Sequence, residues 1–425
     1  MVIKISDPAK KPLSLRVNFF WMFFGNGIYA VCQWGMISTL AKLGSPRYVG
    51  QFGLGLAISA PLIFLTNLSL RPVLATDAKR EFSFSVYFTL RLVSTFIFVI
   101  LLIAIAPIFS RDVETLFVAL IVGIAKAVES ISDIIYGLLQ QRERLDRVAI
   151  SLGLRGGLAL IGLLLIMEVT RNILLSVLWI VIAWLGVLIF FDIPQAVLFE
   201  KFRIISLVSY KGALWRLVKL SFPVGVTMML VSLKANIPKY LISHLKGEAY
   251  LGYFVALNYL FVAGNMVSSA LGQASSPRLA NYFAKRLSSS FWKLMAKMLS
   301  IGALLGLLGF LLALFLGKPL LAVMYTSDYA RFSDVLIWLS LAAAVGYIAS
   351  FVGYAATAVR EFQVQPIILV ISIFTLITGL FLWLPTHGLV GVAWAMTLSF
   401  FVQGLGFLIV TLRVWLSLHM ERNHD

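Results

Sequence analysis

The sequence has 425 residues, of which 60% are hydrophobic and only 12% are charged. Soluble domains are about 45–50% apolar and about 25% charged, and a globule cannot hide such an excess because much of its surface faces water. At about 20 residues per span, the apolar content supplies roughly a dozen transmembrane helices. The composition therefore excludes a soluble enzyme, a secreted disulfide scaffold and a disordered chain, and it predicts an all-α polytopic membrane protein.

Twelve apolar windows of helix length follow one another along the chain. They fall at about 17–40, 49–70, 84–109, 113–138, 148–167, 172–193, 217–243, 249–272, 294–317, 333–357, 364–384 and 388–415. This spacing predicts an N-lobe of six helices at 17–197, a linker at 198–216 and a C-lobe of six helices at 217–416. Short segments at 1–16 and 417–425 form the two ends.

The formal net charge is +17, and most basic loop residues fall on the side of the predicted membrane that carries both termini. Such a bias in Lys and Arg sets the orientation of membrane proteins, so we expect both termini and the linker in the cytoplasm. It also accounts for the net charge without a nucleic-acid partner.

The two halves contain a weak internal repeat. Tyr48-Val49-Gly50-Gln51-Phe52 opens the second predicted helix, and Tyr250-Leu251-Gly252-Tyr253-Phe254 opens the eighth. An even number of spans separates the two copies, so they run in the same direction across the membrane. Repeats of this kind, related by a pseudo-two-fold axis along the membrane normal, are typical of transporters with a substrate site between the halves.

Charged residues inside spans are costly, at least about 2.5–3.5 kcal/mol each at the bilayer centre, and they therefore mark candidate functional sites. Lys126, Arg155 and Lys234 lie nearer the middle of their spans, and Arg91 lies closer to an end. The polar side chains predicted to accompany them are Asn26, Gln33, Asn236, Asn258 and Asn265. A cavity lined by cations predicts an anionic ligand; the alternative is structural pairing between helices.

The fourth predicted helix carries Lys126, Glu129, Ser130 and Asp133 on one face, because residues three, four and seven apart stack along a helix. Lys126 and Glu129 are expected to neutralise one another. Asp133 then has two possible roles. It pairs with Arg155 or Arg91 from a neighbouring helix, or it binds H⁺ or Na⁺ and couples transport to an ion gradient, a role also open to Glu129. Asp192 is expected at the membrane interface.

Two prolines, Pro223 and Pro238, bracket the seventh predicted helix and make it the candidate gate. The sequence holds neither a Walker loop nor a paired Cys/His metal spacing. We therefore expect no metal and no cofactor, with energy taken from an ion gradient, the membrane potential or the substrate gradient.

Several stretches resemble a known family. They are Val49-Gly50-Gln51-Phe52 with Asn67-Leu68-Ser69-Leu70-Arg71, Leu251-Gly252-Tyr253-Phe254 with Pro277-Arg278-Leu279-Ala280, Ser327-Asp328-Tyr329, and Pro385-Thr386-His387-Gly388-Leu389-Val390-Gly391. The chain resembles the Wzx-like O-antigen and polysaccharide flippases of the multidrug/oligosaccharidyl-lipid/polysaccharide (MOP) exporter superfamily.

The resemblance implies two six-helix bundles in a MATE-like V and alternating access across a bacterial inner membrane. The implied cargo is an undecaprenyl-diphosphate-linked oligosaccharide, with membrane lipids and the polysaccharide polymerase machinery as partners. Its dianionic headgroup cannot cross hydrocarbon unaided. Lys126, Arg155 and Lys234 are expected to neutralise the diphosphate, while Asn and Gln side chains hold the sugars.

Two other functions stay open at this point. A multidrug or organic-cation exporter of the same superfamily needs an acidic, aromatic cavity. An integral-membrane glycan polymerase or ligase needs a sizeable extracytoplasmic loop with a catalytic acid or base, and the longest such loop here, about 318–332, carries only Asp328 as an acid.

Overall fold

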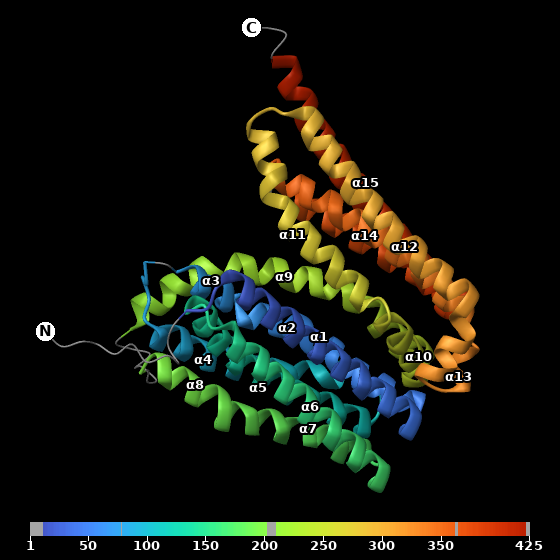
Figure 1. Ribbon diagram of the computed structural model, residues 1–425. Coiled ribbons are helices and arrows are strands. Elements are labelled where there is room, and N and C mark those ends of the chain that lie inside the picture. The colour runs from blue at the N-terminus through green and yellow to red at the C-terminus, as the bar shows by residue number, and fades with distance from the viewer. Residues whose placement is uncertain (1–11, 78, 202–209, 362–363, 422–425) are drawn as a thin grey trace, which may run out of the picture. The chain divides into compact units, whose positions relative to one another are not determined.

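The computed structural model describes residues 12–77, 79–201, 210–361 and 364–421, and every regular element within these ranges is a helix (Figure 1). The all-α prediction is therefore confirmed. The expected terminal segments 1–16 and 417–425 and the linker 198–216 lie partly outside the described residues, because 1–11, 202–209 and 422–425 are not among them.

The chain forms two compact units, Met1–Gly252 and Tyr253–Asp425. The helices of the first unit are α1 (Leu15–Thr39), α2 (Pro46–Asn67), α3 (Leu70–Thr76), α4 (Phe84–Phe109), α5 (Val113–Gln141), α6 (Leu145–Thr170), α7 (Ile173–Val187), α8 (Ile193–Phe199) and α9 (Lys211–Lys246). Two π-helical turns, Leu40–Gly44 and Leu188–Asp192, extend α1 and α7. Helix α10 (Glu248–Tyr259) begins in the first unit and ends in the second.

The second unit continues with α11 (Val262–Ala284), α12 (Ser288–Met324), α13 (Ser327–Ala330), α14 (Ser333–Ala358) and α15 (Gln365–Glu421). Within the described ranges, nine helices are long and apolar enough to cross a membrane, or ten if the bent pair α10 and α11 is one span. Helix α15 is two helices joined at Gly388, whose backbone is not helical. With that division and the less apolar α1, described helices stand at each of the twelve predicted windows.

Local sequence signals begin several of these helices. The Ser45 hydroxyl accepts a hydrogen bond from the backbone N–H of Tyr48, and Pro46 occupies the first turn. Asp112 accepts from Thr115 at the start of α5. Such side chains satisfy backbone N–H groups that have no partner within the helix.

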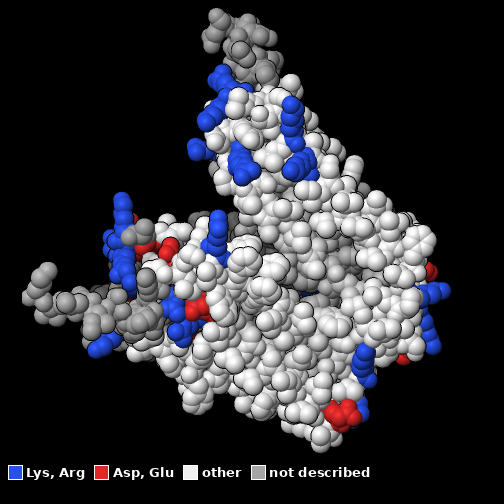
Figure 2. Space-filling view, viewed as in Figure 1, with Lys and Arg blue, Asp and Glu red and all other residues white. Residues whose placement is uncertain are grey.

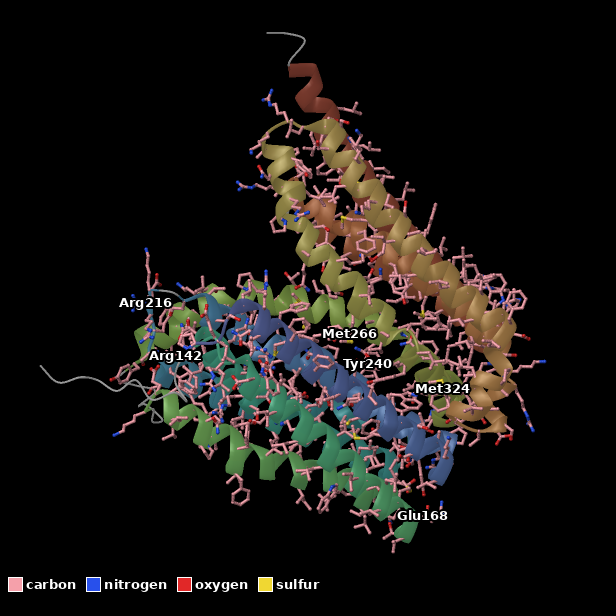
Figure 3. All side chains as sticks on the ribbon, in the orientation of Figure 1. Arg142, Glu168, Arg216, Tyr240, Met266 and Met324 are labelled. Carbon is pink, nitrogen blue, oxygen red and sulfur yellow. The ribbon has the colours of Figure 1, made fainter. Side chains whose placement is uncertain are left out.

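The outward faces of the helices are strongly apolar, with exposed side chains such as Phe23, Ile103 and Phe190. In each unit, charged side chains gather toward the ends of the helices and leave an uncharged surface between them (Figure 2). In the first unit, Arg142 and Arg216 lie at one end and Glu168 lies at the other (Figure 3). A band of apolar surface between polar ends is what a lipid bilayer requires.

Helix α9 packs along α2 within the first unit. The Tyr240 hydroxyl donates a hydrogen bond to the carbonyl of Ala57, and its ring lies 4.7 Å from the ring of Phe109. Near the other end of α2, a Cβ atom on Gly225 would lie 3.2 Å from the carbonyl oxygen of Leu65. The first compact unit thus reaches past the expected linker to include α9.

The two copies of the internal repeat meet where α2 and α10 begin. A Cβ atom on Gly50 would lie 1.7 Å from the carbonyl oxygen of Glu248, and one on Gly252 would lie 1.8 Å from that of Pro46. The contact is reciprocal, since a Cβ atom on either glycine would also lie 3.0 Å from the backbone nitrogen of the other. Only glycine permits such an approach, because any other residue places an atom in the neighbouring backbone.

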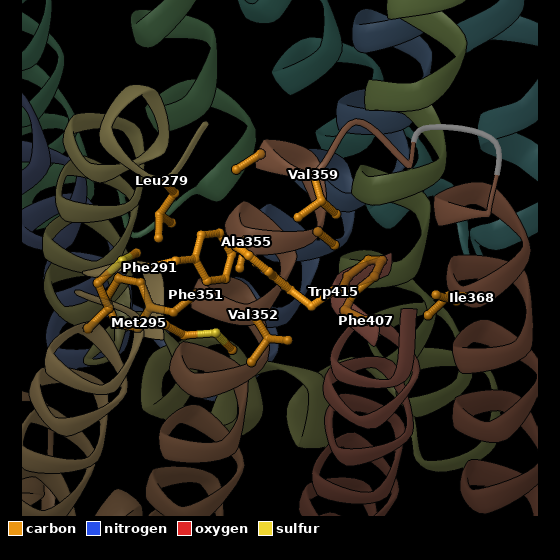
Figure 4. Close-up of a cluster of buried hydrophobic side chains, with 13 residues drawn as sticks. Leu279, Phe291, Met295, Phe351, Val352, Ala355, Val359, Ile368, Phe407 and Trp415 are labelled. Atoms are coloured by element: carbon orange, nitrogen blue, oxygen red, sulfur yellow. The ribbon is translucent and has the colours of Figure 1, made fainter. Parts of the chain in front are cut away.

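The second unit is built around α14, which packs against α11, α12 and α15. Phe351 and Val352 of α14 belong to a buried cluster with Phe291 and Met295 of α12 and Phe407 of α15 (Figure 4). Gly388 lets the chain turn back between the two helices of α15, since its φ of 57° and ψ of −137° form a conformation open mainly to glycine.

Candidate functional site

A polar cavity of about 340 Å³ lies inside the first unit, between α2, α3, α5 and α6. Its polar lining consists of Asn67, Arg71, Lys126, Glu129, Ser130, Asp133 and Tyr136, and its apolar lining of Leu56, Ala60, Ile63, Phe64 and Leu152. The four polar residues predicted to share one helical face, from Lys126 to Asp133, therefore do face one cavity.

A break in the second predicted span places Arg71 at this cavity. Helix α2 ends at Asn67, and Leu68 and Ser69 then take left-handed conformations with φ of 52° and 49° before α3 begins. Two successive left-handed residues that are not glycine are strained, and strain of this kind is concentrated at functional sites. Unwound segments inside a membrane are tolerated where they line a polar cavity, which is their position here.

Arg71 and Arg91 share one carboxylate. The Arg71 guanidinium lies 3.2 Å from Oδ1 of Asp133, and that of Arg91 lies 3.6 Å from Oδ2. Arg91 is completely buried, whereas about a quarter of the Arg71 and Asp133 side chains is exposed. Of the two partners predicted for Asp133, Arg91 is present, and Arg71 is an additional one.

The second ion pair joins Lys126 to Glu129. Their Nζ and Oε2 atoms are 2.6 Å apart, so the predicted neutralisation of this pair is observed. The hydroxyl of Tyr29 in α1 donates a further hydrogen bond to Oε1 of Glu129 at 3.0 Å. The Lys126 ammonium also lies 5.4 Å from the ring centre of Trp184, a cation–π distance.

Arg155, a predicted cavity cation, is fully buried behind the residues that line the cavity. Its guanidinium lies 5.3 Å from the ring centre of Trp184 and 5.9 Å from that of Tyr136, and it donates a hydrogen bond to Ser132 at 2.9 Å. Asp192, expected at the membrane interface, is fully buried within the protein. The α7–α8 span continues as far as Phe199 and carries Asp192 into the interior of the unit.

The charged residues that line the cavity balance one another, and those behind it add one net positive charge. Arg71, Arg91, Lys126 and Arg155 stand against the carboxylates of Glu129, Asp133 and Asp192. Among the described residues, no group of three or more His, Cys, Asp or Glu side chains is arranged to hold a metal ion. Both basic residues that line the cavity are thus paired with carboxylates of the protein.

The other predicted site residues lie elsewhere in the described structure. Gln33 lines a small void of about 10 Å³ together with Lys126. Asn26 and Asn236 each donate to the backbone carbonyl four residues earlier in the same helix. The remaining residues are Lys234, buried in α9; Pro223 and Pro238, both within the continuous helix α9; and Asn258 and Asn265, in α10 and α11.

Sequence reasoning missed Asn67, Arg71, Tyr29 and Tyr136 as parts of the site. Arg71 is recognisable in the sequence only as the first basic residue after an apolar span, and such residues normally lie at the membrane surface. The break that brings it inward contains no glycine or proline between Asn67 and Arg71 to signal it.

Comparisons with known proteins agree with this architecture. No family model matches the sequence. The capsular polysaccharide biosynthesis protein CapF of Staphylococcus aureus is 28% identical over 394 residues, which cover 92% of this chain and 97% of CapF.

Solved structures with the same fold are transporters. An inward-facing MATE multidrug-resistance transporter of the MOP superfamily has a TM-score of 0.71 at 12% identity and covers 91% of this chain and 94% of its own. The lipid II flippase MurJ in an inward closed conformation has a TM-score of 0.68 at 16% identity and covers 94% of this chain and 90% of its own.

A MOP superfamily transporter from Pyrococcus furiosus, whose description reports a binding pocket of reversed polarity, has a TM-score of 0.64 at 14% identity and covers 93% and 94% of the two chains. These likenesses confirm the resemblance seen in the sequence and the MATE-like fold. The chain is a multi-pass membrane protein whose fold is shared with these solved transporters.

Proposed function

We propose that this protein is a flippase that moves a lipid-linked oligosaccharide from the cytoplasmic to the periplasmic leaflet of a bacterial inner membrane. The observation that carries the proposal is the similarity to a capsular polysaccharide biosynthesis protein along nearly the whole chain, on a fold shared with transporters. That fold is also the fold of a lipid II flippase, a protein named for moving a lipid.

The cargo we propose is an oligosaccharide on undecaprenyl diphosphate, taken from membrane lipid and passed to the polysaccharide polymerase machinery. Its diphosphate is the part that cannot enter hydrocarbon, so it needs cations inside the protein. Arg71 and Lys126 line the cavity, with Arg91 and Arg155 behind its wall. Arg offers a planar fork for bidentate phosphate contacts and Lys a compact charge, and the two together suit a diphosphate.

In the proposed cycle, two lobes, 17–197 and 217–416, move so that the cavity is open to one side of the membrane at a time. The prolines Pro223 and Pro238 make α9 the helix most suited to bend during the cycle, since each removes a backbone hydrogen bond. Lys234, Asn236, Asn258 and Asn265 are proposed to contact the glycan or its phosphates in other steps. Coupling to H⁺ or Na⁺ through a carboxylate completes the proposal, and it requires no cofactor.

A multidrug exporter is the second candidate, because the structure with a TM-score of 0.71 belongs to that group. Glu129 and Asp133 would then be the ligands for a cationic drug. Their pairing with Lys126, Arg71 and Arg91 argues against this, since an incoming cation would have to displace a fixed protein cation from each carboxylate.

The test is translocation in proteoliposomes of a fluorescent undecaprenyl-diphosphate oligosaccharide, followed by accessibility of the label to an external quencher. We expect movement by the wild-type protein and a loss of at least about tenfold in Arg71→Ala and Lys126→Ala, since each removes a charge-assisted contact of about 1.5–3 kcal/mol. Arg331→Ala is the control, because this side chain is 81% exposed. No movement with several glycans, together with export of a lipophilic cation, would replace the flippase by a drug exporter.

A further inference from the structure

A second polar cluster lies behind the cavity, around the π-helical turn Leu188–Asp192 that interrupts the α7–α8 span. Asp192 ends this turn and is completely buried. Its Oδ1 atom accepts a hydrogen bond of 2.6 Å from the Ser151 hydroxyl; within the described ranges Oδ2 has no hydrogen bond of normal geometry, although the Ser132 hydroxyl lies near enough to act on the carboxylate. Single π-helical turns inside α-helices are frequently found at functional sites.

No basic group of the described chain lies within ion-pair distance, 4 Å, of this carboxylate, which sets it apart from Glu129 and Asp133. Arg155 is the basic residue whose charge acts on it. Its guanidinium donates one hydrogen bond, to Ser132, and lies against the rings of Trp184 and Tyr136, while its Nε and Nη1 atoms have no hydrogen-bond partner among the described residues. A buried ionised carboxylate without a basic residue at ion-pair distance is costly, and binding a proton removes that cost.

A chain of hydroxyl groups connects Asp192 with the cavity. Tyr136 lines the cavity, and its hydroxyl lies 2.7 Å from the Ser151 hydroxyl, which in turn contacts Asp192. Ser151 has one proton to donate, so when Asp192 is ionised Ser151 donates to it and accepts from Tyr136. When Asp192 is protonated, the carboxyl group itself becomes a donor and the direction of both hydrogen bonds reverses.

We propose that Asp192 is a proton-binding site whose occupancy sets the affinity of the cavity for anions. The proposal rests on the proposed function, because it takes the cavity to be the binding site for a phosphate-bearing substrate. When Asp192 binds a proton, Ser151 passes its own proton to the carboxylate and receives one from Tyr136. Tyr136 is then reprotonated from the solvent of the cavity. One proton is taken up, and the negative charge of Asp192 is lost.

The sign of the coupling follows from the charges around Asp192. The groups that face it are Arg155, Ser151 and Ser132, with Tyr136 one hydrogen bond further away. When ionised, Asp192 offsets the positive charge of Arg155; when protonated, it leaves that charge to act on the cavity. Anions therefore bind more tightly at acidic pH, and by linkage the binding of an anion takes up a proton.

Inorganic pyrophosphate is the probe for this coupling, and calorimetric titration of the full chain in detergent is the measurement. We expect wild-type affinity to rise by about tenfold from mildly alkaline to mildly acidic pH, within the usual range for coupled sites. Asp192→Asn imitates the protonated form, so its affinity should already be high at alkaline pH and should change less with pH. Glu168→Gln, which removes a half-exposed carboxylate at the far end of α6, should behave like the wild type.

Titrations in two buffers of different ionisation enthalpy count the protons taken up on binding. The difference between the wild type and Asp192→Asn removes the contribution of pyrophosphate's own titration, and we expect lower uptake in the variant. If Asp192→Asn fails to fold, Ser151→Ala serves instead: it withdraws a donor from the ionised carboxylate, so the rise in affinity should move to higher pH.

The outcomes separate this inference from the proposed function. Equal proton uptake in the wild type and Asp192→Asn, or binding with the same pH profile in both, overturns the role of Asp192 and leaves the anion-binding cavity in place. A wild-type protein that binds no pyrophosphate at any pH removes the cavity as an anion site, and the inference with it.

Discussion

Gly50 and Gly252, equivalent residues of the internal repeat, lie against each other at the crossing of α2 and α10. A Cβ atom on either one would enter the carbonyl of the facing segment, at 1.7 Å from the oxygen of Glu248 or 1.8 Å from that of Pro46. Because the obstacle is backbone rather than a flexible side chain, a larger residue can be accepted only if one helix moves away.

Gly50→Ala and Gly252→Ala should therefore each destabilise the protein by about 1–3 kcal/mol, the usual cost of forcing extra atoms into a packed contact. Thermal unfolding in detergent measures this as a lower midpoint. Gly27→Ala in α1 is the matched control, since a Cβ atom there meets nothing within 4 Å, and it should be neutral or slightly stabilising. Equal midpoints for Gly50→Ala and Gly27→Ala would show that α2 and α10 do not cross this closely.

The two arginines that share Asp133 should respond differently to mutation. Asp133→Asn leaves the fully buried Arg91 without its ion pair, whereas Arg71→Gln leaves Asp133 still paired with Arg91. We expect Asp133→Asn to lower the unfolding free energy by about 1–3 kcal/mol and Arg71→Gln by less than about 1 kcal/mol. Equilibrium denaturation of both variants gives the order, and the reverse order would contradict the assignment of Arg91 to Asp133.

Removing the carboxylate of Glu129 should strengthen the binding of anions. Glu129 holds the ammonium of Lys126 at 2.6 Å, so Glu129→Gln releases a cation without adding one. We expect pyrophosphate affinity to rise by several fold, and the double variant with Lys126→Ala to lose this gain. Glu114→Gln changes a carboxylate at the start of α5 that does not line the cavity, and it should have no effect on affinity. Weaker binding in Glu129→Gln would mean that Glu129 itself holds the ligand.

Acid should weaken the beginning of α5. Although partial burial raises the pKa of Asp112, hydrogen bonds from the backbone and hydroxyl of Thr115 and the charge of Arg47 outweigh it, so the pKa lies below its ordinary value. A lowered pKa in the folded state stabilises above the pKa of the unfolded chain, and this stability is lost as pH falls through the folded value. The midpoint temperature of the wild type should thus decrease once the pH is below about 4. Asp112→Asn keeps the helix cap but not the charge, so it should lose less on acidification; an identical acid response would assign the effect to other carboxylates.

Sequence patterns that repeat within one or two helical turns predicted the candidate site best. The spacing of three, four and seven residues placed Lys126, Glu129 and Asp133 on one face of α5, and the structure has them in one cavity. The apolar windows predicted the helices for the same reason, since a bilayer leaves only helices or closed barrels as spanning structures. The repeat around Gly50 and Gly252 also pointed to the fold, although sequence alone did not show that its two copies touch.

Features that depend on tertiary structure were beyond such patterns. The left-handed turn at Leu68 and Ser69 contains no glycine or proline, and Pro72 in the first turn of α3 is the one nearby residue that could have signalled a break. This turn brings Arg71 to the cavity. Arg155 and Asp192 are polar residues on apolar helices, and nothing in their spacing says that one stacks on aromatic rings while the other meets a serine. Only the packing of α5, α6 and α7 decides whether such a side chain faces a cavity or lies behind its wall.

The ion pairs within the cavity bear on the half of a transport cycle in which nothing is carried. A carrier that has released its cargo must return through the same conformations with its binding site vacant. Lys126 and Arg71 each hold a carboxylate of the protein itself, so the two cations that line the cavity are matched when no ligand is present. In the flippase cycle proposed above, Glu129 and Asp133 therefore take the place of the cargo's phosphates on the return, and the resetting of the protein does not require another anion.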